Sequence, residues 1–172
     1  MNLRKVLTMM RIVFFILLCF QLPFSAAAET PARLLEQFTG EWRAEGAAFG
    51  APAKSHMAWS PALSGKHFRI EYRIEMFRDA GTSMFEGVGY YQLAEGEGLS
   101  GFWADNSGDL HPIRAEREGD ALVSHWGVED AKQGRTRYEL LSSGEIEVTD
   151  WIRTDEGWRQ FNNAVFRKRA EQ

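Results

Sequence analysis

Apolar and charged residues alternate along most of the chain after Gly40. The clearest case is segment 66–76, in which five apolar or aromatic side chains alternate with five charged or polar ones. Successive side chains of a β-strand point to opposite faces, so this segment presents one apolar face and one solvated face. Its length of about 11 residues is typical of barrels, whose strands must wrap around an interior.

Turn signals divide the chain after Gly40 into ten such segments, counting segment 66–76. Gly, Pro, Asn, Asp and Ser clusters recur about every 8–12 residues, as in antiparallel all-β folds. We therefore predict an all-β fold, an antiparallel up-and-down barrel of about ten strands, because closure removes the exposed strand edges. The expected strands are 41–49, 54–60, 66–76, 84–93, 99–105, 109–118, 121–128, 135–141, 145–153 and 158–168.

One short helix is expected before the first strand. Thr30 is a suitable N-cap, and Pro31 suits the first helical position. Leu34, Leu35 and Phe38 follow at the spacing of one helical face. The segment therefore predicts about two turns of helix at the start of the domain.

Residues 1–28 predict a secretory signal peptide. Three basic residues accompany the nine-residue apolar run 12–20, and the small residues Ser25-Ala26-Ala27-Ala28 follow. This pattern places cleavage after Ala28. The apolar run is too short to span a membrane, which takes about 20 residues. We expect residues 29–172 to form a single domain, exported to the periplasm or the cell exterior without a stable membrane anchor.

Charge and cysteine usage narrow the function classes. Segment 1–28 carries three basic and no acidic residues, so the remainder holds 17 basic and 24 acidic residues, a net charge of −7. Such a chain is repelled by phosphate backbones, and nucleic-acid binding is not expected. Cys19, the single cysteine, lies within the signal segment. The expected mature chain therefore has neither disulfides nor thiolate metal sites. Because the four histidines do not follow a metal-ligand spacing, we predict no metal site.

Several short motifs resemble those of lipocalin-like, or calycin, barrels. Gly40-Glu41-Trp42 followed by Gly46 resembles their opening G-x-W motif. The resemblance covers residues 34–169 and implies a calycin-like fold more than a function. The order of the later motifs resembles a bacterial family of lipocalin-like domains of unknown function: Trp59, Leu63-Ser64-Gly65-Lys66, Phe85-x-Gly87-x-Gly89-Tyr90, Asp155–Phe161 and Phe166–Arg169.

The opening is more distantly similar to nitrobindin and to fatty-acid-binding-protein-like barrels. The resemblance to nitrobindin would imply a haem held by a histidine late in the chain. Here Ala44 replaces a glycine of that opening, and no histidine follows His125. We therefore predict no haem and no other cofactor.

Aromatic residues are frequent, with 18 among residues 29–172. They either fill a small barrel completely, or several of them line a cavity and contact a flat or apolar ligand. Gly87 and Gly89 share one face of a strand. Glycines at such positions allow either a bend of the barrel wall or the close approach of another group.

Polar residues fall in rows that are otherwise apolar. Asp150 shares a row with Val148 and Ile152, where a carboxyl group must find hydrogen-bond partners. We hypothesise a polar patch of Asp150, Arg137 and an asparagine of the last strand, although strict alternation puts Arg137 on the face opposite its neighbours Thr136 and Tyr138. His125 shares a face with Ala121 and Val123, and either face of its strand can point inward.

These observations favour an exported barrel that binds a small apolar or amphipathic molecule. Two alternatives stay open: an enzyme on the same barrel with His125 and Asp150 as acid–base groups, and a non-catalytic interaction domain with a filled barrel. No G-x-S-x-G nucleophile motif occurs, and we assign no catalytic residue. The candidate ligand-binding residues are Trp42, Tyr72, Tyr91, Trp103, His125 and Asn162.

Overall fold

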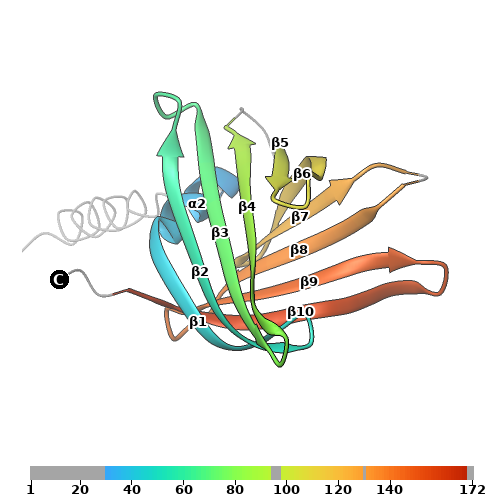
Figure 1. Cartoon of the computed structure of the whole chain (residues 1–172). Coiled ribbons are helices and arrows are strands. Elements are labelled where there is room, and N and C mark those ends of the chain that lie inside the picture. Colours follow the sequence, from blue (N-terminus) through green and yellow to red (C-terminus); the bar gives the residue numbers. More distant parts are fainter. Residues whose placement is uncertain (1–29, 94–97, 130, 170–172) are drawn as a thin grey trace, which may run out of the picture.

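A computed structural model describes residues 30–93, 98–129 and 131–169. Ten antiparallel strands form a closed barrel, and one short helix lies at one end of it (Figure 1). Each strand pairs with its neighbours in the sequence, and β1 pairs with β10 to close the ring. The all-β, ten-strand, up-and-down barrel predicted from alternation is confirmed. The predicted signal segment 1–28 lies outside the described residues.

The strand boundaries follow the turn signals closely. No strand begins or ends more than three residues from its expected position; the largest shifts are at the starts of β2 and β4. Residues 50–52 were expected to connect two strands, but the turn is only Phe49-Gly50, with Ala48 pairing Ala51. The strands are β1 (Gly40–Ala48), β2 (Ala51–Ala62), β3 (His67–Arg78), β4 (Gly81–Gln92), β5 (Gly98–Asp105), β6 (Leu110–Glu118), β7 (Ala121–Gly127), β8 (Gln133–Leu140), β9 (Ile146–Thr154) and β10 (Gly157–Lys168).

Helix α2 (Pro31–Phe38) closes one end of the barrel. The Thr30 hydroxyl accepts a hydrogen bond from the Arg33 amide, as expected for an N-cap. Leu34, Leu35 and Phe38 turn inward and are fully buried. The apolar face of the helix therefore completes the core beneath it.

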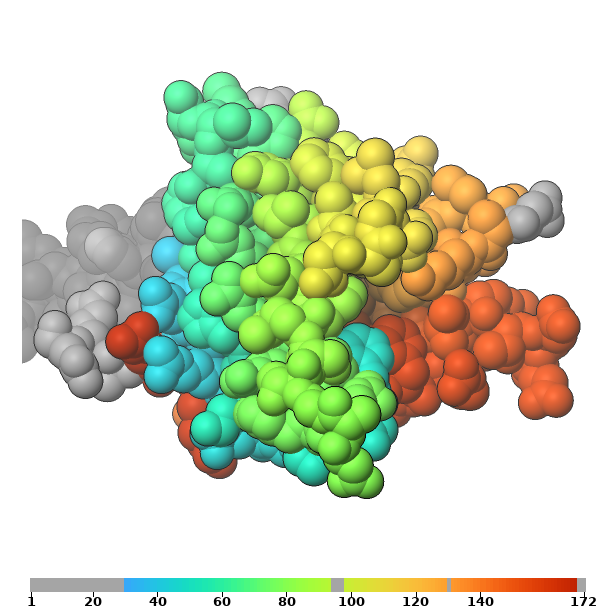
Figure 2. Space-filling view, viewed as in Figure 1, coloured from blue at the N-terminus to red at the C-terminus, as the bar shows by residue number. Residues whose placement is uncertain are grey.

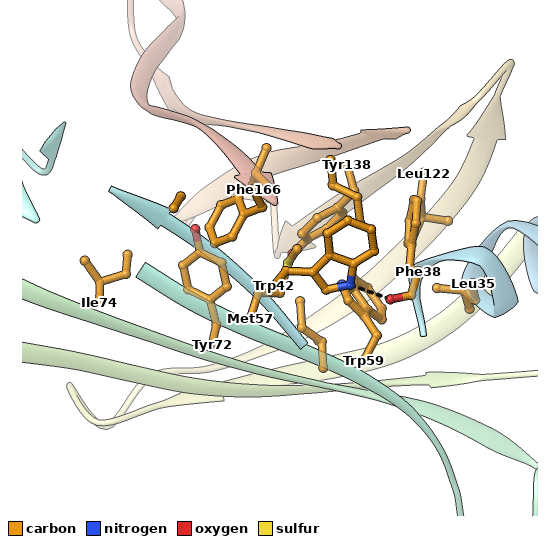
Figure 3. Close-up of a cluster of buried hydrophobic side chains, with 14 of the residues drawn as sticks. Leu35, Phe38, Trp42, Met57, Trp59, Tyr72, Ile74, Leu122, Tyr138 and Phe166 are labelled. Carbon is orange, nitrogen blue, oxygen red and sulfur yellow. Dashed lines mark hydrogen bonds between the residues drawn. The ribbon is translucent and has the colours of Figure 1, made fainter. Parts of the chain in front are cut away.

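The core under the helix consists of large rings in direct contact (Figure 3). Trp42 Nε1 donates a hydrogen bond to the Phe38 carbonyl oxygen at 2.7 Å, which joins β1 to the helix end. The Trp59 ring lies 5.5 Å from Phe38 and 5.2 Å from Tyr138, the latter edge-to-face, measured between centroids. Such pairs each contribute about 0.5–1.5 kcal/mol beyond the burial of their area.

The opposite end of the barrel carries the turns that follow the odd-numbered strands, called the odd-numbered turns below. In an up-and-down barrel the β1–β2, β3–β4, β5–β6, β7–β8 and β9–β10 turns all lie at the end away from the helix. The β7–β8 and β9–β10 hairpins extend outward there (Figure 1), and their tips form separate lobes in the space-filling view (Figure 2). No helix formed by the described residues lies over this end.

Candidate functional site

A cavity of about 360 Å³ occupies the open half of the barrel. Its volume lies within the range of about 300–1,000 Å³ that is typical of small-molecule sites. Strands β3 to β10 and the β1–β2 turn all contribute to its lining. The interior is therefore divided into a filled half beneath the helix and a hollow half beneath the odd-numbered turns.

Aromatic rings form much of the cavity wall. Phe49 lies 5.6 Å from Phe85 and 5.7 Å from Phe161, and Phe85 lies 6.4 Å from Trp103, between ring centroids. Phe49 occupies the two-residue β1–β2 turn with a φ of +50°. That conformation is usually taken by Gly, Asn or Asp in such turns and is unfavourable for a bulky side chain. The turn thus holds an aromatic ring against the cavity where a glycine would suit the backbone better.

Two cavity tryptophans lie flat against glycines of a neighbouring strand. A Cβ atom at Gly87 would come within 2.0 Å of Trp103, and one at Gly134 within 1.9 Å of Trp126. A Cβ at Gly89 would also meet Trp103, at 3.2 Å. The sequence left two roles open for Gly87 and Gly89, a bend of the barrel wall or the close approach of another group. The structure shows the second, because the Trp103 ring lies against both glycines. The glycines let the indoles lie along the wall, which leaves the cavity open.

The floor of the cavity is polar, and Asp150 of β9 lies at its centre. Thr136 Oγ1 donates a hydrogen bond to Asp150 Oδ1 at 2.6 Å, and Asn162 Nδ2 donates to Oδ2 at 2.8 Å. Trp126 Nε1 in turn donates to Thr136 Oγ1 at 3.3 Å. Burial raises the pKa of Asp150, while the Thr136 and Asn162 hydrogen bonds oppose this shift.

Three tyrosines surround the same floor. The Tyr91 hydroxyl shares a hydrogen bond of 2.8 Å with Ser124 Oγ. Burial raises the pKa of Tyr91 to about 12, and it raises the pKa of Tyr72 and Tyr138 well above their ordinary value, assisted by the charge of Asp150. All three phenols therefore stay protonated at neutral pH and present neutral hydroxyl groups.

A β-bulge in β10 positions the last floor residue. Arg159 and Phe161 line the cavity, yet the next residue, Asn162, is also buried. The register with β9 shifts between Gln160 and Asn162, so the inward row changes from odd to even residue numbers. A bulge adds one residue to one strand and often re-aims a side chain next to a functional site. Here it places Asn162 directly opposite Asp150.

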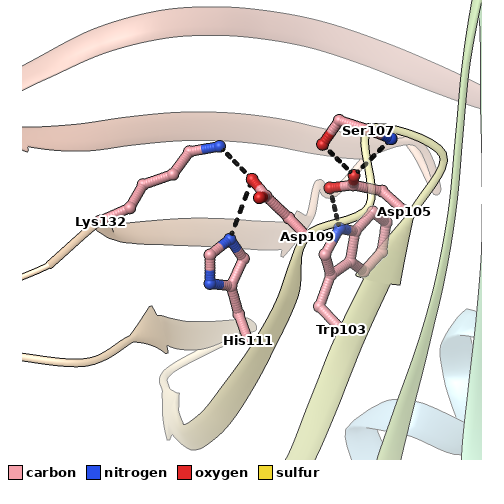
Figure 4. A network of polar contacts seen from close by, with 6 residues as sticks. All are labelled: Trp103, Asp105, Ser107, Asp109, His111 and Lys132. Carbon is pink, nitrogen blue, oxygen red and sulfur yellow. Dashed lines mark hydrogen bonds and ion pairs between the residues drawn. The ribbon is translucent and has the colours of Figure 1, made fainter.

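Ionic side chains gather at the cavity mouth beside the β5–β6 turn (Figure 4). Trp103 Nε1 donates to Asp105 Oδ2 at 3.1 Å, and the Ser107 amide donates to Asp105 Oδ1 at 2.9 Å. Asp109 accepts a hydrogen bond of 2.5 Å from Lys132 Nζ and lies 3.5 Å from His111 Nε2. The Lys132 ammonium lowers the pKa of Asp109, which is therefore ionised at neutral pH.

The candidate residues named from sequence do not all lie at the cavity. Tyr72, Tyr91 and Trp103 line it, and Asn162 contacts its floor through Asp150. Trp42 is instead packed in the filled half, under the helix. His125 is on the outer face, with its side chain 47% exposed and 3.9 Å from Glu116. Of the two faces left open for its strand, the one that carries His125 points outward, so this candidate does not line the cavity.

The inward row of β7 explains the outcome for His125. Both rows of this strand are apolar around residues 121–124, and residues of both are buried. The row containing Ser124 and Trp126 faces the cavity, and these two residues were not among the sequence candidates. Their signal was present: a serine and a tryptophan in one row of a strand indicate a polar and aromatic lining.

The hypothesised polar patch is correct in two of its three members. Asp150 and an asparagine of the last strand, Asn162, are hydrogen-bonded inside the barrel. Arg137 is on the outer face, where it pairs with Glu139 at 3.0 Å and Glu118 at 3.8 Å. The place proposed for the arginine is taken by Thr136, the preceding residue, because strict alternation holds along β8.

Two further kinds of feature are absent from the described residues. In that part of the chain, no three His, Cys, Asp or Glu side chains are grouped as they would be around a metal ion. Nor does it contain a helix with the length and apolar character needed to cross a bilayer.

Comparison with known proteins gives no indication of function, so a functional proposal depends on the fold and the cavity. No protein-family model matches the chain, and no curated protein sequence is significantly similar to it.

Proposed function

We propose that this chain is a binding barrel for a small apolar or amphipathic molecule, held in the open half of its interior. The observation that carries the proposal is the cavity of about 360 Å³, whose walls are largely aromatic and whose floor is polar. Apolar walls supply affinity at roughly 25 cal/mol per Å² of buried apolar surface, and a few polar groups fix the orientation of the ligand. The aromatic walls and the polar floor therefore suit a largely apolar molecule with one polar end.

The rival interpretations account less well for the interior. A filled barrel describes the half under the helix but not the hollow half. An enzyme using His125 and Asp150 together would need both on one face of the sheet, whereas His125 is outside and Asp150 inside. Binding without catalysis is the function that the arrangement supports best.

The proposal also covers the relationship of the chain to calycin-like barrels and its location in the cell. The closed antiparallel barrel is compatible with the calycin-like relationship expected from the G-x-W opening and the motif order. The same proposal takes the chain to be exported, on the basis of the secretory pattern in residues 1–28. Its ligand would then be met in the periplasm or outside the cell.

A cavity-filling variant tests the binding proposal. Ile152 lines the cavity, and Glu147 on the same strand belongs to the outward row. Native mass spectrometry against fatty acids, isoprenoids, haem and flavins should reveal a one-to-one complex with an apolar class. Ile152→Trp should weaken that complex at least about tenfold, or about 1.4 kcal/mol, because the indole occupies the ligand space.

The matched control is Glu147→Trp, which adds the same side chain to the outer face. It should bind as the unchanged protein does, and circular dichroism should give the same spectrum for both variants. The proposal fails if no compound binds, or if Ile152→Trp binds as tightly as Glu147→Trp.

A further inference from the structure

Three hydrogen bonds at the cavity floor run toward one acceptor, the Asp150 carboxyl group. Trp126 donates to Thr136, Thr136 donates to Asp150, and Asn162 donates to the other oxygen of the same carboxyl group. A carboxylate offers about four lone-pair sites, of which these bonds use two. Asp150 therefore keeps acceptor capacity toward the cavity that it lines.

Two further polar atoms of the floor are buried without a hydrogen-bond partner among the described residues. They are the Tyr72 hydroxyl and Asn162 Oδ1, in residues that are only 7% and 5% exposed. The Asn162 side chain is near enough to oppose the rise in the pKa of Tyr72, but the two side chains do not form a hydrogen bond of ordinary geometry. Leaving buried polar groups unsatisfied is unfavourable, so a ligand that bonds to them regains part of their cost of desolvation. Asn162 Oδ1 can only accept a hydrogen bond, whereas the phenol of Tyr72 can either donate or accept.

Positive charge is absent from this floor within the described part of the chain. The basic side chains of the cavity lining are Lys132, His111 and Arg159. Lys132 and His111 both face Asp109 at the mouth. Arg159 pairs with Ile152, nearer the β9–β10 turn than Asp150. The side chains that act on Asp150 are Thr136 and Asn162. A carboxylate ligand inserted head first would meet Asp150 with no cation between the two like charges.

We infer that the cavity takes an apolar chain ending in a hydrogen-bond donor, a hydroxyl or an ammonium group, and rejects the carboxylate of the same length. This inference rests on the proposed binding function and names the chemical class of its ligand. An ammonium group at the floor can donate to both Asp150 and Asn162 Oδ1, whereas a hydroxyl donates to one of them and can accept a bond from the Tyr72 phenol. The chain lies among the aromatic rings between the floor and the mouth.

Three probes of equal chain length test the inference: decanol, decylamine and decanoate. Titration by tryptophan fluorescence at neutral pH, with native mass spectrometry for stoichiometry, should give decanol or decylamine an affinity about tenfold or more above that of decanoate. The inference is overturned if decanoate binds as tightly as both of the others. If none of the three binds, and the wider set of apolar compounds also fails, the binding function itself is wrong.

The role of the carboxyl group is tested by Asp150→Asn, which keeps the size of the side chain and removes its charge. Decanoate binding should strengthen in this variant, so that the discrimination falls to within about threefold. Glu147→Gln is the matched control, because it removes one negative charge from the outward row of the same strand. It should retain the full discrimination, and a loss of discrimination in both variants alike would overturn the inference by assigning it to net charge.

Discussion

At the helix end of the barrel, Trp59 packs against Phe38, Tyr91 and Tyr138 and is 1% exposed. At the open end, Trp103 and Trp126 lie flat on glycines and border empty space. Tryptophan therefore fills the core in one half of the barrel and lines the cavity in the other. Which role a tryptophan takes depends on what its ring packs against, other aromatic rings for Trp59 and a glycine backbone for Trp103 and Trp126.

The largest expected effect comes from truncating a tryptophan in the filled half. Trp59→Ala should lower the free energy of unfolding by about 3–5 kcal/mol, because it leaves a cavity that surrounding rings cannot fill. Trp103→Ala should cost clearly less, because one side of that indole already faces the ligand space. Urea denaturation with linear extrapolation measures both. Equal losses would mean that the two halves are packed alike.

A smaller effect is expected from adding a methyl group at a glycine of the open half. Gly134→Ala would place a Cβ about 1.9 Å from Trp126, which must then swing toward the cavity. We expect a loss of about 1–3 kcal/mol in stability together with weaker ligand binding. Gly46→Ala is the control, because no atom lies within 4 Å of its added Cβ. A destabilisation as large at Gly46 would show that the close contact with Trp126 is not the cause.

The last expected effect is a pH dependence confined to the polar floor. Burial raises the pKa of Asp150 above 3.8, so above that pH the folded state binds more protons than the unfolded state. Its contribution to stability is therefore greatest below about pH 4 and declines as pH rises through the folded pKa. Tyr72, Tyr91 and Tyr138, which face it, titrate only at far higher pH.

Asp150→Asn removes this titration and keeps the side-chain size. The difference in unfolding free energy between Asp150→Asn and the unchanged protein should increase from about pH 4 to about pH 7, in favour of the variant. Urea denaturation at a series of pH values provides the measurement. A difference that stays constant with pH would indicate that the Asp150 pKa is not raised by folding.

The fold could be predicted because period-two alternation and turn residues act locally. Segment 66–76 shows one apolar row and one charged row, so its inward face is unambiguous. In β7 both rows are apolar near residues 121–124, and the sequence alone does not tell which of them faces the interior. For this reason both faces of the strand stayed open in the sequence, and His125, named as a candidate, lies on the outer one.

The candidate site was harder to predict because two of its determinants are not local. The bulge between Gln160 and Asn162 has no glycine or proline to mark it, yet it decides that Asn162 meets Asp150. In the sequence, Gly134 likewise resembles any other strand glycine. Its role becomes apparent only from the contact with Trp126 of the neighbouring strand. Both effects depend on cross-strand register, which alternation within a single strand does not specify.

The extra residue in β10 divides that strand into two segments. Odd-numbered residues face the interior before the bulge, and even-numbered residues face it afterwards. The segment before the shift contributes Arg159 and Phe161 to the mouth, and the segment after it contributes Asn162 and Phe166 to the deep interior. Substitutions in the first segment can retune what the protein recognises without disturbing the second, which anchors the strand in the core. A protein engineer could therefore diversify residues 157–161 as a unit, whereas deleting one residue there would turn the interior side of the first segment outward.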